Sequence, residues 1–182
     1  MGYKEDLLQN VAAIKRAKYL VDNNIHPTEQ DIKIINSFTS WGNFKELLYP
    51  HDLDWQLLTS SKIVLNREAA TKEFIAQLQE IFPEEFTRIY DNIKASIPTS
   101  FYTESEIVKS IFDRIDESSV INSFLDPCVG GGVFIDEFIK RYPEVPKANI
   151  YALDIDSIAT LLIKAKYPDI TVINEGFETF DL

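Results

Sequence analysis

Three consecutive glycines, Gly130, Gly131 and Gly132, are the feature that most restricts how this chain can fold. They lie between a short apolar run and an amphipathic stretch, and they are half of the six glycines in the 182 residues. Glycine lets the backbone turn tightly and approach a ligand without a clashing Cβ atom. The free amides at the start of a following helix can then face an anionic group. We therefore expect a ligand-binding loop between a strand and a helix of an α/β sheet.

The sequence around the glycines alternates short apolar runs with helical ones. This strand–loop–helix order predicts a parallel sheet with right-handed crossovers. The expected strands cover 122–125, 149–154 and 170–174, and the expected helices cover 132–141 and 157–166.

The first half of the chain has a helical pattern with little strand signal. Apolar residues recur at three- and four-residue spacing over 4–22, which predicts an amphipathic helix. Thr28 is expected to cap a second helix, with Asp31 near the position of the acid in a capping box. Asn66 is expected to cap a longer helix over 67–81.

The pattern changes near residue 98, so the sequence predicts two domains. These are an all-α N-terminal domain over 1–97 and an α/β domain over 98–182. Thr103 is expected to open the second domain as the cap of a further helix, in a capping box with Glu106. Trp41 is expected in the core or at the interface between the domains.

The residues before the glycines distinguish between possible ligands. A dinucleotide-binding loop would need a third glycine where Ile135 stands, and a P-loop would need a nearby lysine. Instead, Asp126 and Pro127 precede the glycines, and a carboxylate there repels phosphate but can pair with an ammonium group. S-adenosylmethionine carries such a group and a sulfonium, so it is the expected cofactor. Asp154, at the end of the second strand, suits the two hydroxyls of its ribose.

The segment Leu125-Asp-Pro-Cys-Val-Gly-Gly-Gly-Val-Phe134 resembles the Asp-Pro-Ala-Cys-Gly-Ser-Gly-x-Phe motif of adenine-specific DNA methyltransferases. It departs from that motif in having Cys128 for alanine and Val129 for cysteine, both small or apolar exchanges. The resemblance implies a partial Rossmann-like methyltransferase fold of the S-adenosylmethionine-dependent type. It also implies a set of cofactor-binding residues in this loop: Asp126, Pro127, Cys128, Gly130, Gly132 and Phe134.

Three further segments resemble motifs of the same family, in the same order, so that the resemblance covers residues 100–182. By resemblance, Phe101, Tyr102 and Thr103 help to hold the methionine end of the cofactor, and Asp154 and Ile155 lie at its ribose. Phe177 would stack on the adenine, and Glu175 or Glu178 would accept a hydrogen bond from the adenine amine. Residues 17–50 also resemble the helical lead-in of large methylases of phages and mobile elements.

The family's catalytic motif, Asn/Asp-Pro-Pro-Tyr/Phe, does not occur, because no two prolines of this chain are adjacent. That motif binds the target amine and stacks on the flipped base. We therefore assign no catalytic residue within the chain, and expect the motif beyond Leu182 in a longer protein. The resemblance implies that this parent enzyme methylates the exocyclic amine of adenine in DNA, in restriction-modification or in mobile-element defence, and that the isolated fragment is inactive.

The charge of the chain argues against a main DNA-binding surface. Residues 1–95 carry 11 basic and 14 acidic side chains and residues 96–182 carry 7 and 15, so the net charge of −11 lies mostly in the second part. Phosphate binding needs clustered Lys and Arg side chains. Double-stranded DNA is thus expected to bind through regions outside this fragment.

The composition excludes several classes of protein. No apolar run approaches the ~18 residues of a membrane span, and no signal-peptide pattern is present, so no membrane partner is expected. One cysteine and two histidines make a Cys/His metal site unexpected, and a single cysteine fits the reducing cytoplasm. The oligomeric state stays open.

Several alternatives remain at this point. The chain could be a non-catalytic helical interaction module joined to a degenerate Rossmann-like domain without cofactor. Asp126 could cap the glycine loop, and Tyr102 and Phe177 could be core aromatics. Asp156 could be either a surface acid or a helix N-cap.

Overall fold

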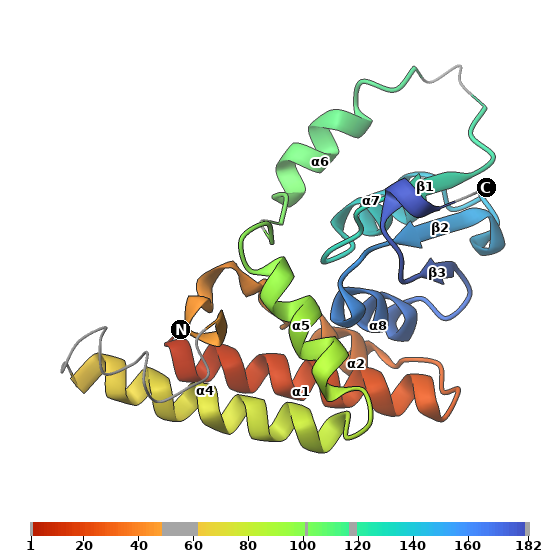
Figure 1. Ribbon diagram of the computed structural model, residues 1–182. Coiled ribbons are helices and arrows are strands. Elements are labelled where there is room, and N and C mark those ends of the chain that lie inside the picture. Colours follow the sequence, from red (N-terminus) through yellow and green to blue (C-terminus); the bar gives the residue numbers. More distant parts are fainter. Residues whose placement is uncertain (1, 49–61, 101, 117–119, 181–182) are drawn as a thin grey trace.

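The structure is a computed structural model that describes residues 2–48, 62–100, 102–116 and 120–180, with the side chains of 62–65 left out (Figure 1). Phe101, one of the expected cofactor residues, lies outside the described residues.

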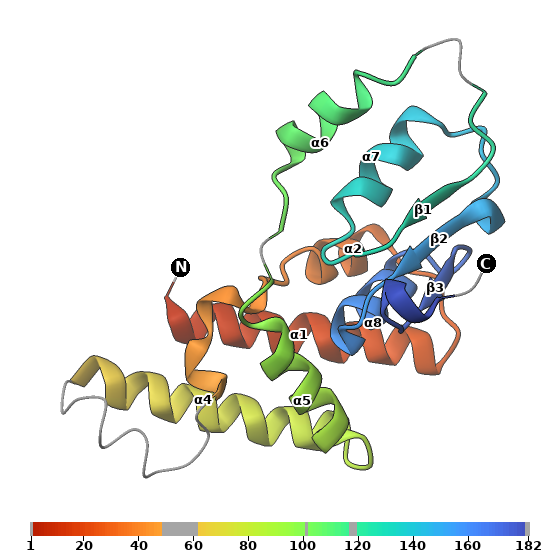
Figure 2. The ribbon, with the colours of Figure 1, turned by 45° about the horizontal axis from the view of Figure 1, so that its top comes forward.

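The N-terminal region consists of helices packed around α1 (Tyr3–Asp22). The predicted apolar stripe of α1 is confirmed, since its core-facing residues Leu7, Val11, Ile14 and Ala17 are all buried. α1 lies alongside α4 in both views, and α5 crosses them (Figures 1 and 2). The remaining elements of this region are α2 (Glu29–Ile35), η1 (Trp41–Asn43), η2 (Lys45–Leu48), α4 (Lys62–Ile81) and α5 (Phe86–Ser96).

One of the three expected helix caps is confirmed and two are wrong. Thr28 caps α2, because its Oγ1 accepts from the Asp31 amide while the Thr28 amide donates to Asp31 Oδ2. Asn66 lies inside α4, which begins at Lys62, so it cannot be the cap. Thr103 is not a cap either, because it lies one residue before the N-cap of the helix that follows it.

The helix after Thr103 is α6 (Ser105–Phe112), and its N-cap residue is Glu104. The Glu104 carbonyl already accepts from the Ile107 amide, so the first turn starts one residue later than a Thr103 cap requires. The Glu104 side chain itself makes no capping hydrogen bond.

The sheet is parallel, as predicted, with β1 (Phe124–Asp126), β2 (Ile150–Leu153) and β3 (Thr171–Ile173) in that spatial order. Asp126 pairs with Ala152, and Ala152 with Val172, so the strands end close together. Helices α7 (Val133–Arg141) and α8 (Ser157–Lys166) follow β1 and β2. Two short 3₁₀ helices complete this region, η3 (Lys147–Asn149) and η4 (Phe177–Thr179). The described chain is therefore a mixed α/β structure, consistent with part of a Rossmann-like fold.

α8 is shared between two hydrophobic cores. Ile158, Leu162 and Ala165 are buried with the N-terminal helices, whereas Ile163 is buried with the residues around the sheet. Figure 2 shows α8 lying between α1 and the strands. The helical region thus packs directly on the element that follows β2. Within the described residues, we find no helix whose length and apolarity would let it cross a lipid bilayer.

Candidate functional site

A cleft of about 280 Å³ opens where β1 and β2 end. Parallel α/β sheets bind their ligands in this place, outside the carboxyl ends of the strands. Ligand pockets usually measure about 300–1,000 Å³, so this cleft lies near the lower end of that range. Its lining comes from the end of α5, the glycine loop and the start of α8: Ser96, Thr99, Ser100, Tyr102, Cys128, Gly130, Asp154, Ile155, Asp156 and Ala159.

Asp126, the last residue of β1, carries a buried carboxylate oxygen without a partner. The residue is 6% exposed, and its Oδ1 accepts from the Cys128 amide at 3.3 Å. Its Oδ2 has no hydrogen-bond partner among the described residues. Burial raises the pKa of this carboxyl to about 6, against a smaller opposing effect of the Cys128 amide, and the charge of Asp154 raises it further. Asp126 does not line the cleft itself, but it ends β1 two residues before Cys128, which does. A buried polar atom without a partner is unfavourable, and a donor supplied from outside the chain would satisfy it.

The glycines of the loop have different roles. Gly130 lines the cleft, has a φ of +45°, and donates its amide to Asp154 Oδ2 at 2.8 Å. Gly132 has a φ of +78° and is the N-cap of α7. A Cβ atom on Gly132 would overlap Ile163 Cδ1 in α8. Gly132 is thus explained by the packing of the loop on α8, whereas Gly130 faces the cleft.

Asp154 follows β2 and is fixed by two backbone amides. Its Oδ2 accepts from Gly130, and its Oδ1 accepts from the Asp156 amide at 2.9 Å. A carboxylate has about four lone-pair sites, so both oxygens can still accept from a ligand. The side chain therefore reaches the cleft in a fixed orientation, as a diol-binding acid requires.

Asp156 is the N-cap of α8, and the surface-acid alternative is wrong. It is 4% exposed, and its Oδ1 accepts from the amides of Ile158 and Ala159 at 2.8 and 3.3 Å. Its Oδ2 accepts from Trp41 Nε1 at 2.8 Å, although 115 residues separate the two in sequence. Burial raises the pKa of the Asp156 carboxyl.

The Tyr102 ring lies flat against the glycine loop. A Cβ atom on Gly130 or Gly131 would come within 3.0 or 3.1 Å of its ring carbons. Burial raises the pKa of the Tyr102 hydroxyl, and the charges of Asp156 and Asp154 add to this. Tyr102 also lines a second hollow of about 250 Å³ beside α2 and α7, so its ring stands between two spaces.

Of the other expected cofactor residues, some line the cleft and some do not. Cys128 and Ile155 are exposed and line it, whereas Pro127 and Thr103 are exposed but do not. Phe134 packs in the core around the sheet, with its ring centroid 6.4 Å from that of Phe112.

The residues expected to contact the adenine of the cofactor lie in the segment after β3. Phe177 is 55% exposed, so a purely core role for it is wrong. Glu175 and Glu178 are also exposed. The charge of Glu178, after burial and the charges of Asp154 and Asp126, contributes to raising the pKa of the Cys128 thiol. None of these three side chains contributes to the lining of the cleft.

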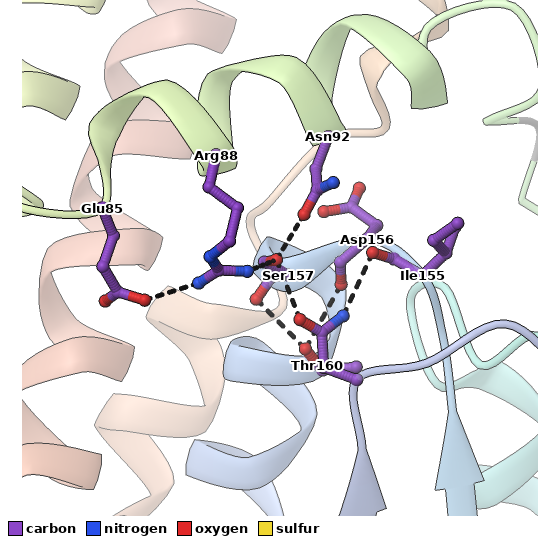
Figure 3. A network of polar contacts seen from close by, with 8 residues as sticks. Glu85, Arg88, Asn92, Ile155, Asp156, Ser157 and Thr160 are labelled. Atoms are coloured by element: carbon purple, nitrogen blue, oxygen red, sulfur yellow. Dashed lines mark hydrogen bonds and ion pairs between the residues drawn. The ribbon is translucent and has the colours of Figure 1, made fainter. Parts of the chain in front are cut away.

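A polar network that the sequence did not reveal lies next to the cleft residues Ile155 and Asp156 (Figure 3). Asn174 donates from Nδ2 to the carbonyls of Asp154 and Ile155 at 2.9 and 3.1 Å. Ser157 Oγ lies 2.9 Å from Asn174 Oδ1 and 2.5 Å from Asn92 Oδ1, and it accepts from Arg88 at 2.8 Å. Asn92 and Arg88 belong to α5, so the network connects α5 to the loop after β2. Such long-range pairs have no local sequence signal, and neither have Ser96, Thr99 and Ser100 of the cleft lining.

Comparison with known proteins gives one informative similarity. No family model and no solved structure matches the chain. A curated protein, the "Type II methyltransferase M.VspI" of Vibrio sp. (strain 343), is 32% identical over 99 residues. That match covers 54% of this chain and 23% of the relative, so the chain spans less than a quarter of the relative's length. Over about half of its own length, this chain is similar to a type II methyltransferase, which supports a methyltransferase relationship.

Proposed function

We propose that this chain is the S-adenosylmethionine-binding portion of a site-specific DNA methyltransferase that methylates the exocyclic amine of adenine. The observation that carries the proposal is the buried, unpartnered Oδ2 of Asp126 at the carboxyl end of β1. It lies beside a glycine loop and a second fixed carboxylate, Asp154. The similarity to a type II methyltransferase supports the same conclusion.

The residues that line the cleft, together with Asp126 just behind it, fit S-adenosylmethionine in chemical type. Asp126 Oδ2 would accept from the α-ammonium group, which supplies the donor that the buried oxygen lacks. Asp154 would accept from the ribose hydroxyls. Gly130 and Tyr102 both line the cleft, where the Tyr102 ring packs against Gly130 and offers an apolar wall. When bound, the cofactor supplies a methyl group on a sulfonium.

We place methyl transfer and DNA binding in further parts of a longer protein. The chain contains no Pro-Pro pair and therefore no Asn/Asp-Pro-Pro-Tyr/Phe motif. Its net charge of −11 does not favour contact with phosphates. The matched relative extends well beyond the matched residues. The adenine specificity rests on the four ordered motifs around Tyr102, Asp126, Asp154 and Phe177, and a role in restriction-modification or mobile-element defence follows from the same resemblance.

Isothermal calorimetry of the purified chain with S-adenosylmethionine tests the proposal. We expect one binding site per chain, with binding lost or weakened at least about tenfold in Asp126→Asn, since the charged hydrogen bond is removed. Asp169→Asn is the matched control, because this exposed acid lies before β3, at the opposite end of the sheet. Absence of binding both by the chain and by a version extended through the expected Pro-Pro motif would refute the proposal.

A second function is favoured by one observation, the Tyr102 ring against Gly130 and Gly131. If that ring fills the space permanently, the chain is a non-catalytic interaction module on a Rossmann-like scaffold. The Tyr102→Ala variant distinguishes the two functions. If the ring blocks the cleft, the parent chain should not bind the cofactor. The Tyr102→Ala variant then either binds it or does not. The cofactor-binding function predicts binding by the parent chain.

A further inference from the structure

The N-terminal helical region reaches the cleft through a chain of hydrogen bonds that starts at Trp41. Trp41 Nε1 donates to Asp156 Oδ2 at 2.8 Å, and the Asp156 amide donates to Asp154 Oδ1 at 2.9 Å. Asp154 Oδ2 then accepts from the Gly130 amide at 2.8 Å. Three hydrogen bonds therefore connect a tryptophan of the helical region to the glycine loop, through the acid proposed to bind ribose.

The Trp41 ring is held in one place by the core of the helical region. It is 0% exposed, and three phenylalanines surround it at ring-centroid distances of 5.0, 6.3 and 5.9 Å: Phe38, Phe44 and Phe74. All three contacts have the edge-to-face geometry that aromatic pairs prefer. The indole N–H therefore points in a fixed direction, and its acceptor has to lie along that direction.

The two oxygens of Asp156 serve different elements. Oδ1 caps α8 by accepting from Ile158 and Ala159, which needs no contact with Trp41. Oδ2 is buried and, within the described part of the chain, accepts from Trp41. A cap alone would be served as well by serine or asparagine, so the second oxygen has a task beyond capping α8.

Asp156 lies two residues after Asp154, in the loop between β2 and α8. A shift of the Asp156 backbone would move its amide away from Asp154 Oδ1 and leave that carboxylate held by the Gly130 amide alone. The carbonyls of Asp154 and Ile155 are held separately by Asn174. The Asp154 carboxylate is therefore held in part by the Asp156 amide, and the second carboxylate oxygen of Asp156 is held by Trp41.

We propose that Trp41 is a positioning residue for the cleft: through Asp156 it fixes the Asp154 carboxylate and the Gly130 amide in the orientation that a ligand meets. The part of this inference that concerns affinity rests on the proposed binding of S-adenosylmethionine. The part that concerns the order of the loop does not. Trp41 touches no cofactor, and its effect on binding is indirect.

The experiment compares Trp41→Phe with Phe74→Leu. The first variant removes the indole N–H and leaves Asp156 Oδ2 without its donor. The second variant disturbs the same aromatic cluster but leaves the hydrogen-bond chain intact. Amide hydrogen exchange is measured at Gly130 and compared with the Ile163 amide in the middle of α8. Binding of S-adenosylmethionine is measured in parallel by calorimetry.

We expect Trp41→Phe to speed exchange at Gly130, relative to Ile163, by about tenfold, the factor for one ordinary hydrogen bond. Phe74→Leu should leave that ratio within about twofold, even if it lowers global stability as much. The dissociation constant should rise by about tenfold in Trp41→Phe only. Equal effects of the two variants on exchange would show that Trp41 merely fills the core, and would overturn the inference.

A second variant guards against failure of Trp41→Phe to fold. Asp156→Ser keeps a good N-cap but cannot reach Trp41, so it should speed Gly130 exchange to the same degree. The double variant should be no worse than either single one, because both break the same connection. Additive effects would contradict the proposed path. If the parent chain binds no S-adenosylmethionine, the proposed function fails, while the exchange data still decide the role of Trp41.

Discussion

At the scale of single residues, Asp126 has a position that stability alone does not explain. Its Oδ2 is buried and has no partner in the part of the chain that the structure describes, and burial raises the pKa of the carboxyl to about 6. A residue that weakens the fold at neutral pH is typical of a binding site, where the ligand supplies the missing contact. Ionisation of Asp126 is therefore expected to lower the stability of the chain but to favour binding of the cofactor.

The stability prediction concerns pH. The pKa of Asp126 rises from 3.8 to about 6 on folding, so the folded chain loses stability as the pH rises through this window. Asp126→Asn removes this loss, and we expect the variant to be more stable than the parent chain by about 1–2 kcal/mol at pH 8. The advantage should vanish near pH 4. Urea unfolding at both pH values measures it, with Asp169→Asn as the control, and a variant less stable than its parent at pH 8 would contradict the assignment.

The binding prediction has the opposite sign. Only the ionised form of Asp126 can pair with an ammonium group, so affinity for S-adenosylmethionine should increase as the pH rises through about 6. Calorimetric titrations at pH 5 and pH 7.5 should differ by about tenfold in dissociation constant, and the Asp126→Asn variant should show no such dependence. A parent chain whose affinity is flat over this range would argue that Asp126 does not meet the cofactor.

At the scale of elements, Gly132 determines how closely the glycine loop, which connects β1 to α7, packs against α8. Its φ of +78° is unfavourable for residues with a side chain, and a Cβ atom would overlap Ile163. We expect Gly132→Ala to lower the free energy of unfolding by about 2–4 kcal/mol, from strain and overlap together. Adding Ile163→Val, which removes Cδ1, should restore the part due to overlap. Chemical denaturation of Gly132→Ala, of Ile163→Val and of the double variant checks this. A Gly132→Ala variant as stable as the parent chain would refute it.

Most elements could be predicted from the sequence because their signals are local. The stripe of Leu7, Val11 and Ile14 defines α1, and the Thr28–Asp31 pair closes on itself within one turn. The cap at Asn66 was wrong because a residue suited to capping also occurs inside helices, as it does in α4. Local patterns thus predict which elements exist better than where each begins.

The site could be predicted only in part for the same reason. Asp126, Gly130 and Asp154 follow strands in a parallel sheet, so topology alone brings them together. The hydrogen bonds from Trp41 to Asp156 and from Ser157 to Asn92 join residues 115 and 65 positions apart. No periodicity or spacing encodes such contacts, which arise when two elements pack.

At the scale of the whole molecule, α8 joins the two regions that the sequence divides at residue 98. Ile158, Leu162 and Ala165 are buried beneath the N-terminal helices, and they would be exposed without them. The polar connections from α5 to Ser157 add to this dependence. The two regions are therefore expected to fold together, although the sequence pattern of the first is all-α and that of the second is α/β.

The fragment 98–182 tests this interdependence. We expect it to lack a cooperative unfolding transition and to bind the dye ANS, because the apolar face of α8 is uncovered. The complete chain should unfold in one cooperative transition by circular dichroism and by fluorescence. A fragment that unfolds cooperatively by itself would show that the regions are independent domains.

Methyl transfer is also a property of the whole molecule. The 182 residues contain no Pro-Pro pair, so we expect no transfer of labelled methyl groups from S-adenosylmethionine to adenine in DNA by this chain alone. A version extended through the expected motif serves as the positive control. Adenine methylation by the 182 residues would contradict this expectation.

The central claim is that S-adenosylmethionine binds in the cleft at the carboxyl ends of β1 and β2. The most direct measurement is a titration of the ¹⁵N-labelled chain with S-adenosylmethionine, followed by nuclear magnetic resonance. We predict saturable shifts of the amides of Cys128, Gly130, Asp154 and Ile155, with little change in the middle of α4. No shifts at saturating cofactor, or shifts confined to the N-terminal helices, would contradict the claim.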